Sequence, residues 1–476
     1  MVQKNSKTTG KIPATFQRDL EKFTSQLLEG KEYLIISHHD ADGITSCAIM
    51  VDFLRAQGKE VVYRCIKQLD SRIVQEIKTL DYETLVFTDM GSGQLSILEE
   101  YDIKDCFIVD HHEPEKKYER QINPHFYGFD GGRDISASGM AYLVARAGGW
   151  KHLPHLAIIG AIGDMQESDG RLHSLNRFIM EEAIAQGKLK VKNDLRIFGR
   201  QSRPLTQMLT YANEPIIPGL SGNQVECASF IEGLGIELQR EDGSWKTYVD
   251  LTWEERKKLL SALYIHLLNY NTPEFIIQKL VGEVYTLVDE AKYSELRDGK
   301  EFATLLNACG RQEECMVGVK VCLGNRNEAL SEARRLLERH RAQLRQGLEF
   351  LAQSEVQTLE NLYYFDGSGR IKESIIGVIA GMAYGAQIIP PDKPVLAFAE
   401  DKDDPTLLKV SARANWELVN KGIHLGEAMR EQSRKVGGEG GGHDIAAGAR
   451  IPRVKRDEFL NGVNKQFARQ LGLLSA

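Results

Sequence analysis

Four short segments of the chain combine acidic residues with histidine or glycine, and each directly follows an apolar run. Residues 37–43 read SHHDADG, residues 88–93 read TDMGSG, residues 110–114 read DHHEP and residues 160–164 read GAIGD. Carboxylate oxygens and imidazole nitrogens without thiolates suit Mn²⁺ or Mg²⁺, and suit Zn²⁺ or Co²⁺ less well. These segments therefore predict divalent-cation chemistry.

The number of acidic groups favours two cations over one. If the segments meet, they bring together more carboxylates than can stay ionised without cations. Five or six ligands are also too many for one ion that must hold water and substrate, whereas a pair of ions about 3.5–4 Å apart is an arrangement that hydrolyses phosphate esters. We expect this site to contain Asp40, Asp42, Asp89, His111 and Asp164.

Each segment taken alone has a simpler interpretation. An acidic residue after a strand is commonly a turn former or a helix N-cap, and adjacent histidines are more often surface residues than ligands. Four such segments, in order, in one part of the chain favour the two-metal site.

The elements that must position these segments alternate in type. Apolar runs at residues 33–36, 61–63, 85–87 and 107–109 predict buried strands. Residues 44–54, between the first two runs, have the apolar spacing of a helix. This β-α-β-α-β order predicts an α/β fold with a parallel sheet and helices on both faces. Ligands bind at the carboxyl ends of the strands in such sheets, and three of the four segments lie there.

The remainder of the chain contains fewer chemical signals. We expect helices at residues 254–269 and 274–292, and a long amphipathic helix at residues 327–353 that joins two lobes. The expected parts are a catalytic domain at 1–200, a mostly helical insertion at 201–300, a linking segment at 301–355 and a smaller α/β domain at 356–476.

Composition limits the protein class. The 476 residues are 42% hydrophobic, enough for about three domains, and include no apolar run long enough to span a membrane. Residues 1–7 lack an apolar signal core, so we expect a cytoplasmic location. Seven cysteines without a C-x-x-C pair argue against a disulfide framework or a thiolate zinc site. The net charge of −7 argues against a protein coated in positive charge, but it leaves room for a local basic groove.

Several of these segments together resemble the DHH phosphoesterase superfamily. Its four motifs are similar to residues 40–43, Asp89, residues 110–112 and Asp164. Two later segments extend the resemblance: LNACGR at residues 306–311 resembles RecJ exonucleases, and GGEGGGH at residues 437–443, with AAG three residues later, resembles the DHH-associated C-terminal domain. The residues of these motifs are most similar to those of archaeal RecJ-like nucleases of the GINS-associated type.

The resemblance implies a role for each residue of the site. Asp89 would bridge two divalent metals, with Mn²⁺ favoured and Mg²⁺ or Co²⁺ as alternatives. His112 would contact the scissile phosphate, and Asp110 belongs to the same catalytic motif. The implied ligands are His38 and Asp40 for one metal, and Asp42, His111 and Asp164 for the other.

Substrate contacts are expected in the second lobe and at the linking segment. Glycines let a backbone approach a phosphate closely, so Gly441, Gly442 and His443 are candidates, although a flexible loop is an alternative. Arg413 and Arg311 are further phosphate candidates, and a buried structural role would also explain Arg311. Basic residues between residues 188 and 203 form either a solvated face or part of a strand-binding groove.

We therefore expect a two-metal phosphodiesterase that degrades single-stranded DNA, or RNA, in replication or repair. A 5′-to-3′ direction and a GINS or other replication partner for the insertion follow from the resemblance alone. The insertion could instead be a structural brace. Two other functions remain open: hydrolysis of small nucleotides or oligoribonucleotides, and a non-catalytic replication scaffold.

Overall fold

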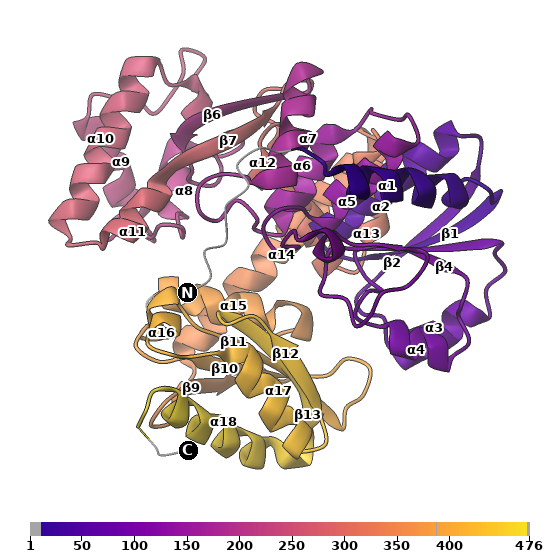
Figure 1. The fold of residues 1–476 in the computed structure, drawn as a ribbon. Helices are drawn as coiled ribbons and strands as arrows, with labels where there is room; N and C mark the ends of the chain where they lie inside the picture. Colours follow the sequence, from indigo (N-terminus) through magenta and orange to yellow (C-terminus); the bar gives the residue numbers. More distant parts are fainter. Residues whose placement is uncertain (1–10, 387, 474–476) are drawn as a thin grey trace. The chain divides into compact units, whose positions relative to one another are not determined.

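The computed structural model describes residues 11–386 and 388–473. The chain folds into two compact units that meet in the sequence between Leu337 and Glu338 (Figure 1). The four expected domain boundaries stay predictions, and residues 1–7, which bear on the expected location, lie outside the described residues. Among the described residues, none of the helices is long and apolar enough to cross a lipid bilayer.

A five-stranded parallel sheet forms the centre of the first unit, in the order β2-β1-β3-β4-β5, which confirms the expected α/β fold. Its strands are β1 (Glu32–His38), β2 (Glu60–Ile66), β3 (Thr84–Thr88), β4 (Cys106–Val109) and β5 (Gln121–Ile122).

Helices cover both faces of this sheet. Tyr33 and Ile35 of β1 pack into the larger core with α1, α2, α5, α6 and α7, whereas Leu34 and Ile36 pack into a smaller core with α3 and α4. Alternate residues of a strand point to opposite faces, so a sheet buried on both sides needs the continuous apolar run seen here. The helices are α1 (Ala14–Leu27), α2 (Ala41–Ala56), α3 (Ser71–Lys78), α4 (Leu95–Glu100), α5 (Ala137–Ala147), α6 (Pro154–Gly163) and α7 (Ser174–Ala185).

The insertion connects the two strands of an antiparallel pair, β6 (Leu189–Leu195) and β7 (Val281–Leu287). It has a core of its own. The helix expected at residues 274–292 is wrong beyond its first turn, because only Glu274–Ile277 is α-helical and the segment continues as a 3₁₀ turn and then as β7. Its Val, Tyr and Thr residues favour a strand once β6 supplies a partner. The helices of the insertion are α8 (Leu205–Thr210), α9 (Gln224–Gly233), α10 (Trp253–Asn269) and α11 (Glu274–Ile277), with 3₁₀ turns at Tyr248–Asp250 and Gln278–Leu280.

After the insertion the chain returns to the sheet domain. A short 3₁₀ turn (Glu295–Arg297) leads into α12 (Gly299–Arg311) and α13 (Cys315–Cys322), whose apolar residues join the larger core of the first unit. The long helix α14 (Glu328–Gln353) follows, one residue shorter than expected.

The second unit is a six-stranded mixed sheet in the order β12-β13-β11-β10-β9-β8. Helices pack on both of its faces. Its elements are β8 (Gln357–Thr358), β9 (Tyr363–Asp366), α15 (Glu373–Gly385), β10 (Val395–Glu400), β11 (Leu407–Arg413), α16 (Trp416–Asn420), α17 (Leu425–Lys435), β12 (Glu439–Gly442), β13 (Ala446–Pro452), a 3₁₀ turn (Arg453–Lys455) and α18 (Arg456–Gln470).

The glycine-rich segment near residue 440 forms the strand β12 rather than a flexible loop. β12 pairs with β13 and lies against α17. A Cβ atom at Gly440 would lie 2.7 Å from the carbonyl oxygen of Met429, and one at Gly426 would lie 2.0 Å from that of Gly442. Packing against α17 therefore explains Gly440 and Gly426. A Cβ at Gly441 would meet no atom of the described residues within 4 Å, so its backbone can face a ligand.

Buried charges join the base of the insertion to the sheet domain. The guanidinium of Arg196 contacts Glu167, and Arg200 Nη2 lies 2.5 Å from Asp194 Oδ2. Both arginines are buried, so the hypothesis that this basic run lines a strand-binding groove is wrong for these two residues. Glu301 of α12, 1% exposed, accepts hydrogen bonds from the backbone N–H of Gln201, at 2.8 Å, and from the Ser202 hydroxyl.

This network generates a prediction about pH. Burial, and then the charge of Asp298, raise the pKa of Glu301 from 4.5 to about 7. Between these values the folded chain binds more protons than the unfolded chain, so the free energy of unfolding falls as pH rises from about 4.5 to about 7. Glu301→Gln mimics the protonated form. We expect this substitution to remove up to about 3 kcal/mol from the change in the free energy of unfolding over this pH range.

The measurement is urea unfolding of the wild-type protein and of Glu301→Gln, in EDTA, at several pH values between about 5 and 8. The difference between the two curves isolates Glu301 from the other titrating groups. Parallel curves would contradict the assignment.

Candidate metal centre

The carboxyl ends of β1, β3 and β4 bring three of the four acidic segments together. Asp40 follows β1 and is the N-cap of α2, where its Oδ1 accepts a hydrogen bond from the Gly43 N–H at 3.0 Å. Asp42 lies in the first turn of α2 and accepts hydrogen bonds from Ala137 N, at 2.7 Å, and Ser138 N, at 3.0 Å. Both carboxylates are thus oriented by helix N-termini, which favour negative charge.

The fourth segment arrives on a helix. Asp164 is the C-cap of α6, and Gln166 Nε2 donates to its Oδ2 at 2.8 Å and to the Gly131 carbonyl at 2.7 Å. The sequence did not single out Gln166. Only its place two residues after Asp164 could have indicated it.

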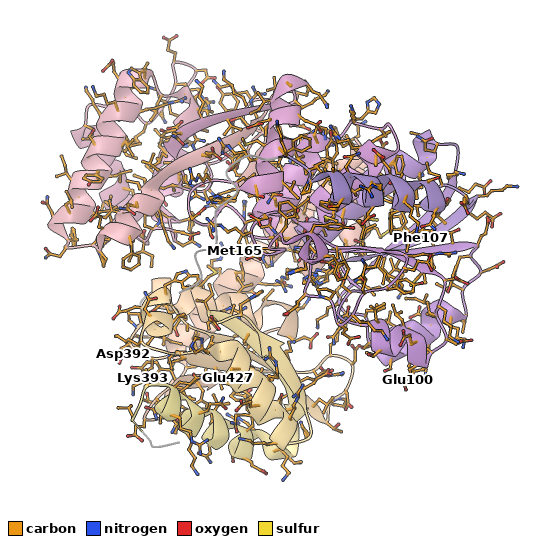
Figure 2. All side chains as sticks on the ribbon, viewed as in Figure 1. Glu100, Phe107, Met165, Asp392, Lys393 and Glu427 are labelled. Atoms are coloured by element: carbon orange, nitrogen blue, oxygen red, sulfur yellow. The ribbon has the colours of Figure 1, made fainter. Side chains whose placement is uncertain are left out.

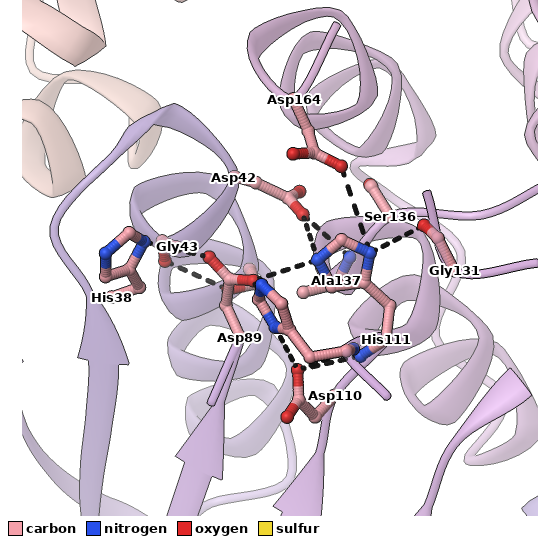
Figure 3. Close-up of polar contacts among 12 residues, drawn as sticks. His38, Asp42, Gly43, Asp89, Asp110, His111, Gly131, Ser136, Ala137 and Asp164 are labelled. Carbon is pink, nitrogen blue, oxygen red and sulfur yellow. Dashed lines mark hydrogen bonds and ion pairs between the residues drawn. The ribbon is translucent and has the colours of Figure 1, made fainter. Parts of the chain in front are cut away.

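All six implied metal ligands lie in groups whose ligand atoms are within 4.8 Å of one another. Figure 3 labels each of them except Asp40. The groups are His38, Asp40 and Asp89; Asp42, His111 and Asp164; and Asp89, Asp110, His111 and His112.

Asp89 lies between the first two groups and directs one oxygen toward each. Its Oδ2 lies 3.5 Å from His38 Nδ1, which is itself 3.0 Å from Asp40 Oδ2. Its Oδ1 lies 3.2 Å from His111 Nε2, which is 3.8 Å from Asp42 Oδ2. This is the geometry expected of a carboxylate that bridges two ions.

The surroundings of His111 fit a cation. Its Nδ1 lies 2.7 Å from the Gly131 carbonyl, which can only accept, so Nδ1 carries a proton and the neutral ring has its Nε2 lone pair toward Asp89 Oδ1. That oxygen is buried and accepts no hydrogen bond from the described residues. Two lone pairs facing each other require a cation or an additional proton between them. A backbone carbonyl that holds the far nitrogen is the common support of a metal-ligating histidine.

The pKa shifts of the site residues also indicate that the site is suited to bind cations. Burial, and then the charge of Asp89, raise the pKa of Asp42 to about 7, and burial also raises the pKa of Asp164. Burial alone would lower the pKa of His38 and of His111, but the neighbouring carboxylates raise both well above the usual value. Bound cations would reverse this balance by stabilising the carboxylates.

The oxygens of Asp110 accept several hydrogen bonds, including bonds from both of the histidines that follow it. It accepts from Ser92 N at 3.0 Å, from His111 N at 2.8 Å and from His112 Nδ1 at 2.9 Å. These bonds outweigh burial and lower its pKa. Asp110 therefore positions the two histidines, and the half-exposed ring of His112 keeps Nε2 available for a substrate oxygen.

Strained backbone occurs at two points of the site. Asp89 has φ of 60° and Met165, directly after Asp164, has φ of 59°. Non-glycine residues in the left-handed region cost about 1–3 kcal/mol and persist only where the surroundings enforce them. The exposed side chain of Met165 can be followed in Figure 2. The strain lies at residues that orient ligands.

The expected substrate contacts lie partly outside this centre. Arg311 ends α12, and its charge interacts with that of Asp40, although burial lowers its pKa. In the second unit, Arg413 of β11 lies against α15, where a Cβ atom at Gly377 would be 2.5 Å from Arg413 Nη2. His443 follows β12 and is exposed. The roles of these residues, with Gly441 and Gly442, stay predictions.

Comparison with known protein families matches this organisation. Residues 32–163 match the N-terminal domain of the DHH family, residues 197–281 the DHH-CID domain and residues 370–469 the DHHA1 domain. The protein MJ0831 of Methanocaldococcus jannaschii is 31% identical over 468 residues, which cover 95% of this chain and 98% of that protein.

Two solved structures are similar in fold. RecJ of Thermus thermophilus in complex with Mn²⁺ has a TM-score of 0.59 and 17% identity, and the match covers 96% of this chain and 55% of RecJ. This chain therefore spans about half the length of that protein. CDC45 of Entamoeba histolytica has a TM-score of 0.61 and 14% identity, with 95% and 99% covered. At these identities the likeness concerns the fold.

The position of Asp89 generates the main prediction about the centre. Asp89→Ala should abolish hydrolysis and lower Mn²⁺ occupancy at both positions, because the loss of one shared carboxylate weakens the binding of both ions. Isothermal titration with Mn²⁺ and a hydrolysis assay measure the two effects. Asp19→Ala, which removes an acidic side chain that bonds to Tyr127, is the matched control and should retain both properties. Half of the wild-type rate in Asp89→Ala would exclude a bridging role.

Proposed function

Because the chain belongs to the DHH family of metal-dependent phosphoesterases, we propose that it is a RecJ-like exonuclease acting on single strands. Its substrate is single-stranded DNA, with RNA as the alternative, and it removes nucleotides in the 5′-to-3′ direction during replication or repair. The observation that carries the hydrolytic part is the pair of ligand groups that share Asp89.

The ligand set assigns two positions. His38, Asp40 and Asp89 would hold one ion, and Asp42, Asp89, His111 and Asp164 the other. When bound, two such ions supply electrophilic stabilisation of the phosphoryl oxygens and activation of water for attack on phosphorus.

The protein's own groups orient the substrate around this centre. His112, held through Nδ1 by Asp110, can donate from Nε2 to a non-bridging phosphate oxygen. Protonation of His112 would supply this donor. Burial lowers the pKa of His112, but the hydrogen bond and the charge of Asp110 outweigh that effect and raise it. Arg311 supplies a further positive charge on the Asp40 side of the centre.

The second unit supports a polymeric substrate. It offers the edge strand β12 with open space at Gly441, followed by the exposed His443, and Arg413 on β11, which is separated from β12 by β13. Glycine backbone and basic side chains bind phosphates without reading bases, which suits an enzyme that moves along a strand.

Two other functions compete with this proposal. A DHH phosphoesterase for small nucleotides or oligoribonucleotides would use the same centre but would gain nothing from long strands. A non-catalytic replication scaffold would not need a complete ligand set, whereas every implied ligand is present and grouped here.

The deciding experiment compares strand length and direction. We expect the purified protein in Mn²⁺ to degrade a thirty-nucleotide single strand much faster than a dinucleotide, and to release the label first from the 5′ end. DNA and RNA substrates labelled at either end are assayed in parallel, with Asp89→Ala reporting any contaminating nuclease. Preference for the dinucleotide would establish the small-substrate alternative, and absence of turnover would favour the scaffold.

His443→Ala should weaken binding of long single strands while leaving Mn²⁺ binding unchanged, because His443 lies outside the metal groups. Loss of one charge-assisted phosphate contact predicts a several-fold rise in KM. Fluorescence anisotropy with a labelled strand measures affinity. His152→Ala, an exposed histidine of the first unit, is the control. Unchanged affinity and rate in His443→Ala would contradict the assignment.

We assign the insertion to partner docking, with a GINS-type replication complex as the partner. Its core is separate from that of the sheet domain, and helix α10 presents several exposed apolar side chains. Trp253 is 74% exposed, Ile265 56% and Leu268 49%. Such a face is typical of a protein contact. The alternative is a brace, which the buried charges at Arg196 and Glu301 would support.

The strand pair allows a clean deletion of the insertion. Arg196 N donates to Leu280 O at the end of the β6–β7 ladder, so an Asn-Gly turn can replace residues 197–279. A docking module predicts a folded protein that still cuts short strands but no longer co-purifies with GINS. Ile265→Glu combined with Leu268→Glu should reproduce the loss of binding without the deletion. A deleted protein that is folded, inactive and still partner-bound would contradict docking.

A further inference from the structure

Helix α12 contacts the loop that carries Asp40, although the two lie far apart in the sequence. The side-chain oxygen of Asn307 accepts a hydrogen bond from the backbone N–H of Ala41 at 2.9 Å. Ala41 is the first residue of α2, and the first N–H groups of a helix have no partner within the helix. Asp40 satisfies one of these groups, on Gly43, and Asn307 satisfies another.

Close packing holds the same loop from two sides. A Cβ atom at Gly310 of α12 would lie 1.8 Å from the carbonyl oxygen of His39. A Cβ atom at Gly163 of α6 would lie 2.6 Å from the Ala41 Cβ. Backbone and small side chains therefore meet without space for adjustment. The path of residues 38–41 depends on where α12 lies.

That path sets the direction of one metal ligand. Asp40 uses Oδ1 for the Gly43 N–H, which leaves Oδ2 to face His38 Nδ1 at 3.0 Å and the first metal position. If the Ala41 N–H loses its partner, the first turn of α2 can shift and carry Asp40 Oδ2 with it. Asp42, by contrast, is held independently through Ala137 and Ser138 of α5.

We propose that Asn307 is a positioning residue for the metal position formed by His38, Asp40 and Asp89. It makes no contact with the ion itself. This inference rests on the proposed two-metal function. It assigns Asn307 to one of the two positions, whereas a purely structural role would lower stability and leave both metal affinities equal to those of the wild type.

The test uses the full-length chain and Mn²⁺ binding measured by isothermal titration, with no substrate present. Asn307→Leu keeps the volume and removes the acceptor. We expect it to weaken one of the two Mn²⁺ affinities roughly 10-fold and leave the other within about twofold, the usual effect of removing a group that orients a ligand. Asn307→Asp retains an oxygen acceptor for the Ala41 N–H and should restore the lost affinity.

A double-mutant cycle identifies the affected position. Asn307→Leu should add little to the loss already caused by Asp40→Asn, whereas it should add in full to the loss caused by Asp164→Asn. Thr304→Ala removes a hydroxyl that donates within α12, to Lys300 O, and should leave both affinities unchanged.

Two results would overturn the inference: unchanged affinities in Asn307→Leu, or an equal fall at both positions. Melting of each variant in EDTA reports whether it is folded. Should Asn307→Leu fail to fold, Asn307→Ser, which shortens the side chain, takes its place in the titration and in the cycle. Failure of the proposed function would look different, because the wild-type protein would then bind fewer than two Mn²⁺ ions or hydrolyse no strand.

Discussion

The concentration of negative charge around Asp89 is the constraint on which the rest of the first unit depends. Asp42, Asp89 and Asp164 lie close together with almost no solvent around the first two. Such a group is stable only if cations or protons neutralise it. The raised pKa of Asp42 and the facing lone pairs of Asp89 and His111 are two expressions of this need. A metal-dependent hydrolase benefits from it, because the same charge that destabilises the empty site provides affinity for the ions.

The fold holds these charges in place with backbone rather than with long side chains. Helix N-termini orient Asp40 and Asp42, and a backbone carbonyl orients His111. Glycines at positions 163 and 310 permit the backbone approaches that keep the Asp40 loop in place. Rigid supports of this kind preserve ligand geometry when the charge in the site changes.

Helix α12 contacts both the insertion and the loop that carries the metal ligand Asp40, which lie in separate segments of the chain. Its first turn carries Glu301, which bonds to the start of the insertion, and its last turns carry Asn307 and Gly310, which contact the Asp40 loop. A partner that shifts the base of the insertion would therefore act on the same helix that positions Asp40. The buried carboxyl group of Glu301 predicts that this junction responds to pH, whereas the contact of Asn307 with Ala41 involves no titratable group.

The sequence by itself determined the local features of this protein. Four apolar runs predicted four of the five strands of the parallel sheet, and the residues after them indicated candidate metal ligands, because strand periodicity and ligand type are properties of a few neighbouring residues. These residues include Asp40, Asp89 and His111. The central strands of the first unit were therefore predictable, whereas the roles of the ligand residues stay predictions.

The tertiary structure decided the features whose partners lie far away in the chain. β7 needed β6 to become a strand rather than a helix, and the glycines of β12 reflect the approach of α17. Likewise, the bond from Ala41 to Asn307 joins residues 266 positions apart. Packing and hydrogen bonding between distant segments depend on how the whole chain folds, and local composition carries no record of them.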